Sequence, residues 1–289
     1  MGSIIQHLRF PFSYLLLPVF LFAAIKQGGS SEDAKNAFTL FLVLHLLVYP
    51  SSNAYNSLQD KDEGSIGLIK NPSTPPKSLG LVSILFDFVA LIACLSISIR
   101  TTLFVAVYIL ASRLYSYRKV RLKKYPILGF LTVFIFQGGW IYLICMEAFS
   151  DYGFSLWTIN NLEEMLAASC LIGSIYPLSQ IYQHQQDKAD GVRTISMLLG
   201  KKGSFILSGI LFILGSYLIM HFQISYYGLF NPLFFIYLGF QLPSLIYFNY
   251  WFYKVIQDES QANFKHTMRM SLISATCMNA FFLFVIYAG

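Results

Sequence analysis

Nine apolar runs follow one another along this chain, most of them long enough to cross a lipid bilayer as a helix. A helix needs roughly 20 apolar residues to span the hydrocarbon core. Only 12% of the residues are charged, which is about half the share expected of a soluble domain. The sequence therefore predicts an all-α polytopic membrane protein, with residues 1–289 forming a single domain. The predicted spans cover residues 10–27, 36–57, 79–98, 101–117, 126–147, 164–184, 204–222, 230–252 and 268–288.

Positive side chains are distributed unevenly between the two sides of this predicted bundle. An odd number of spans puts the termini on opposite sides of the membrane. With the N-terminus inside, 17 of the 20 Lys and Arg residues fall on inner segments, and only Lys26, Lys35 and Arg100 remain outside. Because positive loops stay in the cytoplasm, we expect an integral protein of a bacterial cytoplasmic membrane with a cytoplasmic N-terminus. The net charge of +6 is explained by these loops and gives no indication of nucleic-acid binding.

A twelve-residue pattern occurs twice and ends in an aspartate both times. The copy from Tyr49 to Asp60 reads Y-P-S-S-N-A-Y-N-S-L-Q-D, and the copy from Tyr176 to Asp187 reads Y-P-L-S-Q-I-Y-Q-H-Q-Q-D. Each copy closes an apolar run, and four predicted spans separate them, so both reach the same inner face. This arrangement predicts a nine-transmembrane-helix bundle made of two parallel four-helix repeats plus a ninth helix.

Helical spacing places the polar residues of each copy on one face, because residues three or four apart are neighbours on a helix. Pro50 and Pro177 lack an amide donor and clash with the preceding turn, so each helix is expected to kink there. The expected stripes are Ser52, Asn56 and Asp60 in the first copy, and Ser179, Gln183 and Asp187 in the second.

Carboxylate and carboxamide oxygens of this kind are the ligands that Mg²⁺ prefers. Two such clusters facing each other would hold Mg²⁺ ions and, through them, a diphosphate. A single aspartate at this position would be interpreted more simply as the solvated end of a helix. Two matching copies that reach the same inner face favour a binding site for a metal ion and a diphosphate. The candidate metal ligands are Asn56, Asp60, Glu63, Asp187 and Asp190.

Basic residues lie beside both aspartates and in the following inner loops. Cations near a metal-bound diphosphate would neutralise the charge that develops as it leaves. We interpret Asp60, Asp187 and Lys188 as the candidate catalytic residues. The candidate substrate-binding residues are Asn56, Lys61, Arg118, Arg121, Lys123, Gln183 and Arg193.

With these motifs the chain resembles the UbiA-type intramembrane prenyltransferases. That family has nine transmembrane helices and two cytoplasmic Asp-rich motifs, N-x-x-x-D-x-x-x-D and D-x-x-x-D, after helices two and six. Asn56 and Asp60 match the first two positions of the first motif, and Asp187 matches the last position of the second. The segments 115–126 and 191–200 are also similar to the family's inner loops.

Two motif positions depart from the family pattern. The last aspartate of the first motif falls on Gly64, and the first aspartate of the second falls on Gln183. Displaced carboxylates lie nearby at Asp62, Glu63 and Asp190. They would restore the ligand count from a neighbouring turn, or their displacement would weaken metal binding.

The resemblance implies Mg²⁺-dependent transfer of an isoprenyl group from a prenyl diphosphate to a lipophilic acceptor inside the membrane. Tyr55 and Tyr182 recur with the repeat, and aromatic faces stabilise cations, so they are candidate substrate-binding residues; packing is the competing interpretation. Three alternatives remain open: a terpene cyclase of the same fold, a transporter, and a catalytically silent protein that binds a lipid diphosphate. The expected partners are the prenyl diphosphate, the acceptor and membrane lipid, without nucleic acid.

Overall fold

The computed structural model describes residues 2–27, 29–60, 64–149, 158–228 and 232–288. Over these residues the ordered structure is helical, apart from an isolated antiparallel bridge between Ile66 and Ile69. The all-α prediction is therefore confirmed.

Each of the nine apolar runs coincides with a helix or with a series of adjoining helical segments. The first five runs correspond to η1 (Phe10–Leu15) with α2 (Leu17–Ala24), α3 (Ser31–Leu42) with η2 (Val43–Val48) and α4 (Tyr49–Asp60), α5 (Leu79–Leu95), α6 (Ile99–Ser116), and α7 (Pro126–Val133) with η4 (Phe134–Gly139) and α8 (Trp140–Phe149). The last four correspond to α9 (Ile159–Gln180), α11 (Ile195–Tyr227), α12 (Leu233–Gln257) and α13 (Phe264–Ala288). The shorter elements are α1 (Gly2–Leu8), η3 (Leu122–Lys124), α10 (His184–Ala189) and η6 (Glu259–Gln261).

Fewer helices than nine meet a strict test of length and hydropathy for a membrane span. Within the described ranges five do so, or six if the bent pair around Leu16, with a 43° bend, is counted as one span. The α5 helix is apolar but shorter, with 17 residues. The five are Ser31–Asp60, Pro126–Phe149, Ile195–Phe222, Leu233–Gln257 and Phe264–Ala288.

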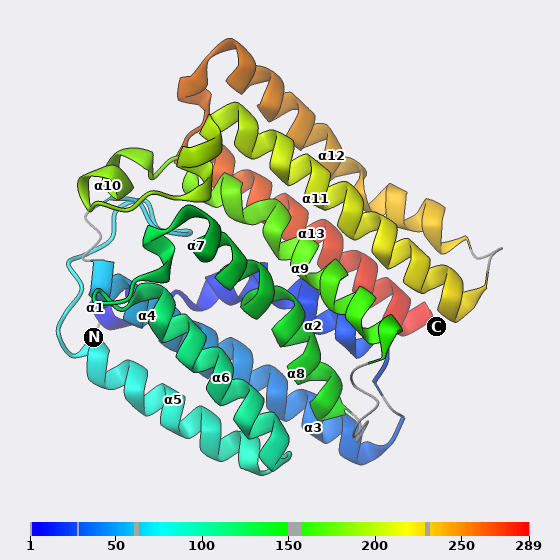
Figure 1. Ribbon diagram of the computed structural model, residues 1–289. Helices are drawn as coiled ribbons and strands as arrows, with labels where there is room; N and C mark the ends of the chain where they lie inside the picture. Colours follow the sequence, from blue (N-terminus) through cyan, green and yellow to red (C-terminus); the bar gives the residue numbers. More distant parts are fainter. Residues whose placement is uncertain (1, 28, 61–63, 150–157, 229–231, 289) are drawn as a thin grey trace.

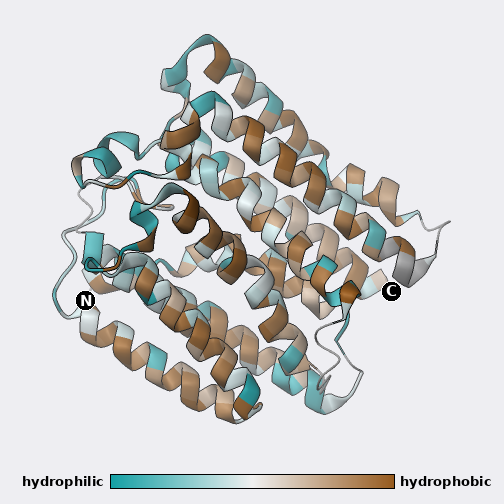
Figure 2. Ribbon diagram, viewed as in Figure 1, coloured by the Kyte–Doolittle hydropathy of each residue, from teal (hydrophilic) through white to brown (hydrophobic). Residues whose placement is uncertain are grey.

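The helices lie alongside one another as a bundle, with α4, α5 and α6 on one side and α11 and α12 on the other (Figure 1). Helix α13 packs against α12 and also against α2, so the last helix meets the first apolar run. We call the end of the bundle where α4 and α9 terminate the aspartate end. Hydrophobic side chains dominate the long helices and polar ones gather at their ends (Figure 2).

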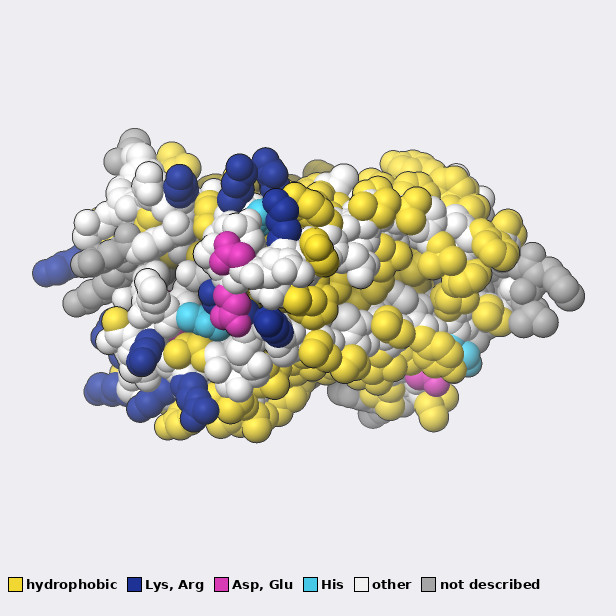
Figure 3. All heavy atoms as spheres, turned by 90° about the horizontal axis from the view of Figure 1, so that it is seen from above, with side chains coloured by type: hydrophobic (Ala, Val, Ile, Leu, Met, Phe, Trp, Pro, Cys, Tyr) yellow, Lys and Arg dark blue, Asp and Glu magenta, His cyan; other side chains and the backbone are white. Residues whose placement is uncertain are grey.

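Basic side chains concentrate at the aspartate end. Seen from above, Lys and Arg side chains gather over this end, whereas hydrophobic side chains cover most of the remaining visible face (Figure 3). Large apolar residues such as Phe88 and Ile213 are exposed on the outside of the bundle. In water such a surface would aggregate, whereas acyl chains would cover it in a bilayer.

Aromatic side chains fill the bundle at the end away from the aspartates. Phe22 stacks on Phe282 with ring centroids 5.2 Å apart, and Phe22 also contacts Tyr142 at 5.1 Å. Phe149 and Phe281 are fully buried beside them. This packing fills the interior at the far end of the bundle.

Two π-helical segments interrupt the regular helices. The η2 segment directly precedes Tyr49 and Pro50, where the proline cannot donate a hydrogen bond to the preceding turn. The η4 segment ends in Gly138 and Gly139, against α9. A Cβ on Gly138 would lie 2.3 Å from the Cα of Ser169, and the amide of Gly139 donates to Ser169 Oγ at 2.9 Å. Only glycine permits this approach between η4 and α9.

Candidate functional site

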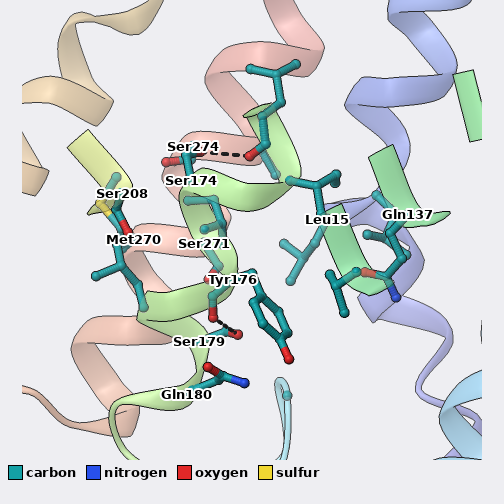
Figure 4. Close-up of a pocket in the computed structure, with 18 of the residues that line it drawn as sticks. Leu15, Gln137, Ser174, Tyr176, Ser179, Gln180, Ser208, Met270, Ser271 and Ser274 are labelled. Atoms are coloured by element: carbon teal, nitrogen blue, oxygen red, sulfur yellow. Dashed lines mark hydrogen bonds between the residues drawn. The ribbon is translucent and has the colours of Figure 1, made fainter. Parts of the chain in front are cut away.

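One cavity of about 450 Å³ opens inside the bundle and receives both copies of the repeated motif. Asn56 and Asp60 line it from α4, and Gln183 and Asp187 line it from the start of α10. Two aspartates that are 127 positions apart in the chain thus face the same space. The cavity then continues between the helices, where Figure 4 shows residues such as Tyr176 along its wall.

Asp60 is held by two cations from the loop between α6 and α7. Its side chain is only 6% exposed. Arg121 Nη2 lies 3.2 Å from Asp60 Oδ1, and Lys123 Nζ donates to Oδ2. Burying a carboxylate is costly unless cations pair with it. The loop therefore neutralises the first aspartate where the cavity opens.

Arg121 also connects the first motif to the second. The same guanidinium pairs with the carboxylate of Asp190, just after α10, and Nη1 donates to the Asp190 carbonyl at 3.2 Å. Burial by itself lowers the pKa of Arg121, but the two carboxylates outweigh it and raise that pKa. Burial raises the pKa of Asp190, and Arg121 outweighs it, so that the pKa is lowered. Both groups are therefore charged at neutral pH.

Arg118 reinforces the same link from the outer side of the loop. Its Nε donates to the Gln59 carbonyl at 2.5 Å, and its Nη2 lies 3.4 Å from the Asp60 carbonyl and 3.5 Å from Asp190 Oδ1. Its side chain is nearly half exposed, so it remains accessible to an anionic ligand. The end of α4 and the residue that follows α10 are thus joined through one basic loop.

The oxygen donors in this cavity fit a Mg²⁺ ion that arrives with a diphosphate. Asn56 Oδ1 is buried without a hydrogen-bond partner, and the carboxylates of Asp60 and Asp187 line the same space. Within the described ranges, no three His, Cys, Asp or Glu side chains form a preformed metal centre. Mg²⁺ typically uses one or two protein carboxylates and takes its other ligands from water and substrate phosphates. Asn56, Asp60 and Asp187 provide a donor set of this kind.

Comparison with known proteins decides the family of this chain. Residues 15–273 match the model of the UbiA prenyltransferase family. The chain belongs to the UbiA prenyltransferase family. It is therefore a membrane-embedded transferase of prenyl groups, as the motifs predicted. A search of curated proteins finds no match.

Solved structures share the fold at low sequence identity. A UbiA homolog from Archaeoglobus fulgidus bound to DMAPP and Mg²⁺ is 17% identical, with a TM-score of 0.65 over 99% of this chain and 100% of the other. A UbiA homolog from Aeropyrum pernix K1 is 14% identical, with a TM-score of 0.68 over 95% and 98%. A digeranylgeranylglyceryl phosphate synthase is 19% identical, with a TM-score of 0.61 over 99% and 97%. These likenesses establish the UbiA fold.

The cavity-facing side of the first UbiA motif differs slightly from the predicted stripe. Asn53, Asn56 and Asp60 line the cavity, whereas Ser52 does not and instead hydrogen-bonds Tyr108. Asn56 and Asp60 therefore face the cavity as predicted, and only the first position of the stripe differs, because Asn53 lies three residues before Asn56 on the same face.

The second motif is not one continuous helix, so the prediction of a single helical stripe is wrong there. Helix α9, which contains Pro177, ends at Gln180, and α10 begins only at His184. Gln183 and Asp187 still line the cavity because a turn at residues 181–183 changes the direction of the chain between α9 and α10. Gln183 Nε2 donates to the Ser65 carbonyl at 3.1 Å, which fixes this turn against the segment that follows the first motif.

The remaining predicted residues fall into three groups. Tyr182 lines the cavity and packs edge-on against Phe264 at 5.3 Å. Tyr55 does not line it; its ring lies 4.2 Å from the guanidinium carbon of Arg113. The exposed Lys188 and Arg193 do not line it either. Lys61 and Glu63 lie outside the described residues.

Sequence reasoning missed one basic residue of the cavity. Arg9 lines it, is only 9% exposed, and donates from Nη2 to the Asn53 carbonyl at 3.2 Å. Its backbone is left-handed, with φ of 48°, between α1 and η1. The sequence did contain a signal, because Arg9 directly precedes the first apolar run. We used it only as one of the positive residues that set the orientation in the membrane.

His184, inside the second motif, binds the neighbouring helix. Its Nε2 lies 2.8 Å from Ser196 Oγ on α11. Burial, and then the nearby Lys201, lower its pKa, so the ring is neutral at pH 7. It does not line the cavity, and it attaches α10 to α11.

Proposed function

We propose that this UbiA-family protein transfers an isoprenyl group from a prenyl diphosphate to a lipophilic acceptor inside the membrane, with Mg²⁺ as cofactor. One observation carries the proposal: Asp60 and Asp187, one from each copy of the motif, line a single cavity together with Lys123 and Arg9. The solved UbiA homologs bound to DMAPP or GPP with Mg²⁺ support the same substrate class.

Asn56, Asp60 and Asp187 are the residues that would hold Mg²⁺, and Asp190 and Glu63 are proposed to assist. When bound, Mg²⁺ would neutralise part of the charge on the diphosphate. Arg121 and Lys123 already form ion pairs with the Asp60 carboxylate. We propose that Arg121 and Lys123 turn from Asp60 to the diphosphate when the ligand binds. Asp60 then has Mg²⁺ as its partner and the two cations have the diphosphate, so no charge is left without a partner.

The basic residues would bind the diphosphate and stabilise it as it departs. Lys123, Arg121 and Arg9 are buried or nearly so, so their charges act in a low-dielectric environment, where electrostatic stabilisation is stronger. Lys188 remains a proposed catalytic residue beside Asp187, and the other basic residues proposed to bind the diphosphate are Arg118, Arg193 and Lys61.

The chemistry requires one bond to break and one to form. The bond between C1 of the isoprenyl chain and the diphosphate oxygen breaks, and diphosphate leaves with the electron pair. An electron-rich carbon or oxygen of the acceptor forms a bond to C1 and loses a proton to solvent. Tyr182 offers an aromatic face in the cavity toward the developing cation. The apolar wall, with Phe12, Leu16 and Phe212, would hold the chain and exclude water.

The finer topology is also part of this proposal. We propose one domain over residues 1–289, with two parallel four-helix repeats and a ninth helix. The aspartate end would face the cytoplasm, since basic residues gather there. A bacterial cytoplasmic membrane is the proposed location.

The test is product analysis with the purified protein in lipid nanodiscs. A labelled prenyl diphosphate is incubated with Mg²⁺, first with a membrane lipid extract and then without any acceptor, and products are identified by mass spectrometry. Prenylated lipid together with released diphosphate, lost on chelation and restored by Mg²⁺, is the expected result. Terpene product without acceptor would identify a cyclase. Absence of any product, or turnover insensitive to chelation, would contradict the proposal.

A further inference from the structure

The membrane-embedded part of the cavity has several neutral polar side chains within its apolar wall, and we infer that they bind the acceptor, which is a neutral molecule with hydroxyl groups. This inference rests on the proposed transferase function and specifies its second substrate. We call this set the polar band. Its members come from η4, α9, α11, α12 and α13, and they are Gln137, Ser174, Ser208, Gln241, Ser244, Ser271 and Ser274.

The polar band lies inside the bundle, between the two ends of the helices. Ser271 is seven residues from the start of α13 at the aspartate end, or about 10 Å along the helix. Gln241 is sixteen residues before the end of α12, or about 24 Å. In Figure 4, Ser208, Ser271 and Ser274 lie on one side of the view and Gln137 on the other. Polar groups at such depth are costly unless they bind something.

Two members of the polar band are buried and have polar atoms without a protein partner. Gln241 is 1% exposed, its Oε1 accepts no hydrogen bond, and its Nε2 contacts only Met278 Sδ at 3.8 Å. Ser208 is also 1% exposed, and its Oγ has no partner. Both side chains line the cavity. Buried polar groups are nearly always hydrogen-bonded, so these two atoms indicate a ligand with matching groups.

The serines of the polar band have protein partners but keep capacity for more. Ser244 Oγ and Ser274 Oγ lie 2.9 Å apart and satisfy one donor between them. Ser271 Oγ donates to the Thr267 carbonyl at 3.0 Å, and Ser174 Oγ donates to the Leu171 carbonyl at 2.7 Å. Each of these donating hydroxyls retains acceptor lone pairs. The set therefore accepts hydrogen bonds more readily than it donates them.

The charge distribution excludes an ionised ligand from the polar band. The charged residues that line the cavity in the described part of the chain are Arg9, Lys123, Asp60 and Asp187, and all four lie at the aspartate end. A carboxylate or phosphate held by the polar band would have no cation beside it, which is prohibitive in a low-dielectric site. A pure hydrocarbon would leave Gln241 Oε1 and Ser208 Oγ unpaired. A neutral molecule with hydroxyl groups satisfies both conditions, because it donates to Gln241 Oε1 and accepts from Ser208.

Binding of matched ligands tests this with the protein unchanged. Affinities are measured in nanodiscs by calorimetry for three probes of one ring system: dihydroxynaphthalene, its dimethyl ether, and dihydroxynaphthoate. We expect dihydroxynaphthalene to bind, and the ether, which has no donor, to bind about five- to tenfold more weakly. We expect the carboxylate analogue to bind more weakly still. Equal affinity for all three probes, or tighter binding of the carboxylate, would overturn the inference, as would the absence of binding by dihydroxynaphthalene.

Substitutions then locate the binding to the polar band. Gln241→Leu and Ser208→Ala are each expected to weaken dihydroxynaphthalene binding about five- to tenfold. Gln257→Leu, an exposed glutamine at the end of the same helix, is the matched control and should bind as wild type does. Gln241→Met keeps the shape of the side chain if the leucine variant does not fold. Unchanged affinity in both Gln241 and Ser208 variants would refute the assignment.

A separate measurement keeps this inference distinct from the proposed function. Binding of a prenyl diphosphate with Mg²⁺ should be unaffected in Gln241→Leu, because its determinants lie at the aspartate end. If the diphosphate fails to bind wild-type protein, the proposed function fails. If the diphosphate binds but the affinity for dihydroxynaphthalene is unchanged in the Gln241 and Ser208 variants, only the present inference fails.

Discussion

Arg121 lies 3.2 Å from the Asp60 carboxylate, and the same guanidinium pairs with Asp190, which follows the second motif. One loop cation therefore ties together the two halves of the candidate site. The carboxylate that would hold Mg²⁺ is already neutralised. A metal ion alone has to displace Arg121 and Lys123 from Asp60, whereas a metal ion with diphosphate gives these cations a new partner. Metal and prenyl diphosphate are therefore expected to bind cooperatively.

Removing the charge of either motif aspartate tests the site directly. We expect Asp60→Asn and Asp187→Asn each to lower the rate of diphosphate release on the order of 100-fold or more, because each loses a proposed Mg²⁺ ligand. Diphosphate release is measured with a coupled phosphate assay. Glu259→Gln changes an exposed acid at the same end of the bundle and should retain full activity. Full activity in both aspartate variants would show that the site is elsewhere.

Removing Arg121 should uncouple metal binding from diphosphate binding. In wild-type protein, Mg²⁺ alone is expected to raise the melting temperature less than Mg²⁺ with inorganic diphosphate does. In Arg121→Gln, Asp60 loses one competing cation, so Mg²⁺ alone should produce a larger rise than in wild type. Thermal unfolding in detergent measures both. Lys119→Gln, in the exposed part of the same loop, should respond as wild type, and an identical response in Arg121→Gln would rule out the competition.

Asp87 and Arg113 form an ion pair among α4, α5 and α6 that should stabilise the fold. Arg113 Nε lies 3.1 Å from Asp87 Oδ2, and Ser51 Oγ donates to Asp87 Oδ1 at 2.7 Å. Asp87→Asn leaves the Arg113 charge without its partner between helices, so we expect a loss of about 3 kcal/mol, or about 5–10 °C in melting temperature. Glu32→Gln, at an exposed helix start, is the control. Equal melting temperatures for Asp87→Asn and the control would show that the pair contributes little.

The link through Asp190 should persist in mildly acidic solution. The folded-state pKa of Asp190 lies below its ordinary value of 3.8 because Arg121 outweighs the effect of burial. A lowered pKa stabilises the fold above the unfolded-state pKa, and this contribution is lost as the pH falls through the folded-state value. The difference in melting temperature between wild type and Asp190→Asn should thus be constant from about pH 7 to pH 5 and shrink only near and below the ordinary pKa. A difference that already vanishes at pH 5 would contradict the assigned pairing.

Two glycine substitutions test the close approach of η4 to α9. A Cβ on Gly138 would lie 2.3 Å from the backbone of Ser169, so Gly138→Ala must separate the segments and should cost about 1–3 kcal/mol. Gly239, within α12, has nothing within 4 Å of a built Cβ. Gly239→Ala should be neutral or stabilise by up to about 1 kcal/mol, because alanine favours the helix. Unfolding in a denaturing detergent compares the two, and equal stability would mean that the contact is looser than described.

Much of the architecture could be predicted from local sequence. Helices form at all nine apolar runs because a backbone in lipid must satisfy its own hydrogen bonds, whichever side chains it carries. The repeat placed Asp60 and Asp187 at one end of the bundle, because the number of intervening spans fixes the side that each motif reaches. The family motifs also identified the transferase class.

Other features depended on packing between helices. Ser52 and Asn53 are adjacent polar residues in α4, so the sequence alone did not show which of them faces the cavity, and the packing of the helices placed Asn53 there. The break after Gln180 interrupts the predicted second helix, although Ser179, Gln183 and Asp187 all line the cavity, and the turn is held by a contact of Gln183 with the distant Ser65. Local propensity does not encode such contacts.

The sequence by itself determined that this protein is a helical membrane protein with two acidic motifs at one end, because composition and spacing constrain each helix independently of the others. The tertiary structure decided what surrounds those motifs. Arg9, Lys123 and the polar band with Gln241 come from segments far apart in the chain, and only long-range packing brings them to one cavity. Ion pairing and burial depend on distances in space, which the order of residues alone does not specify.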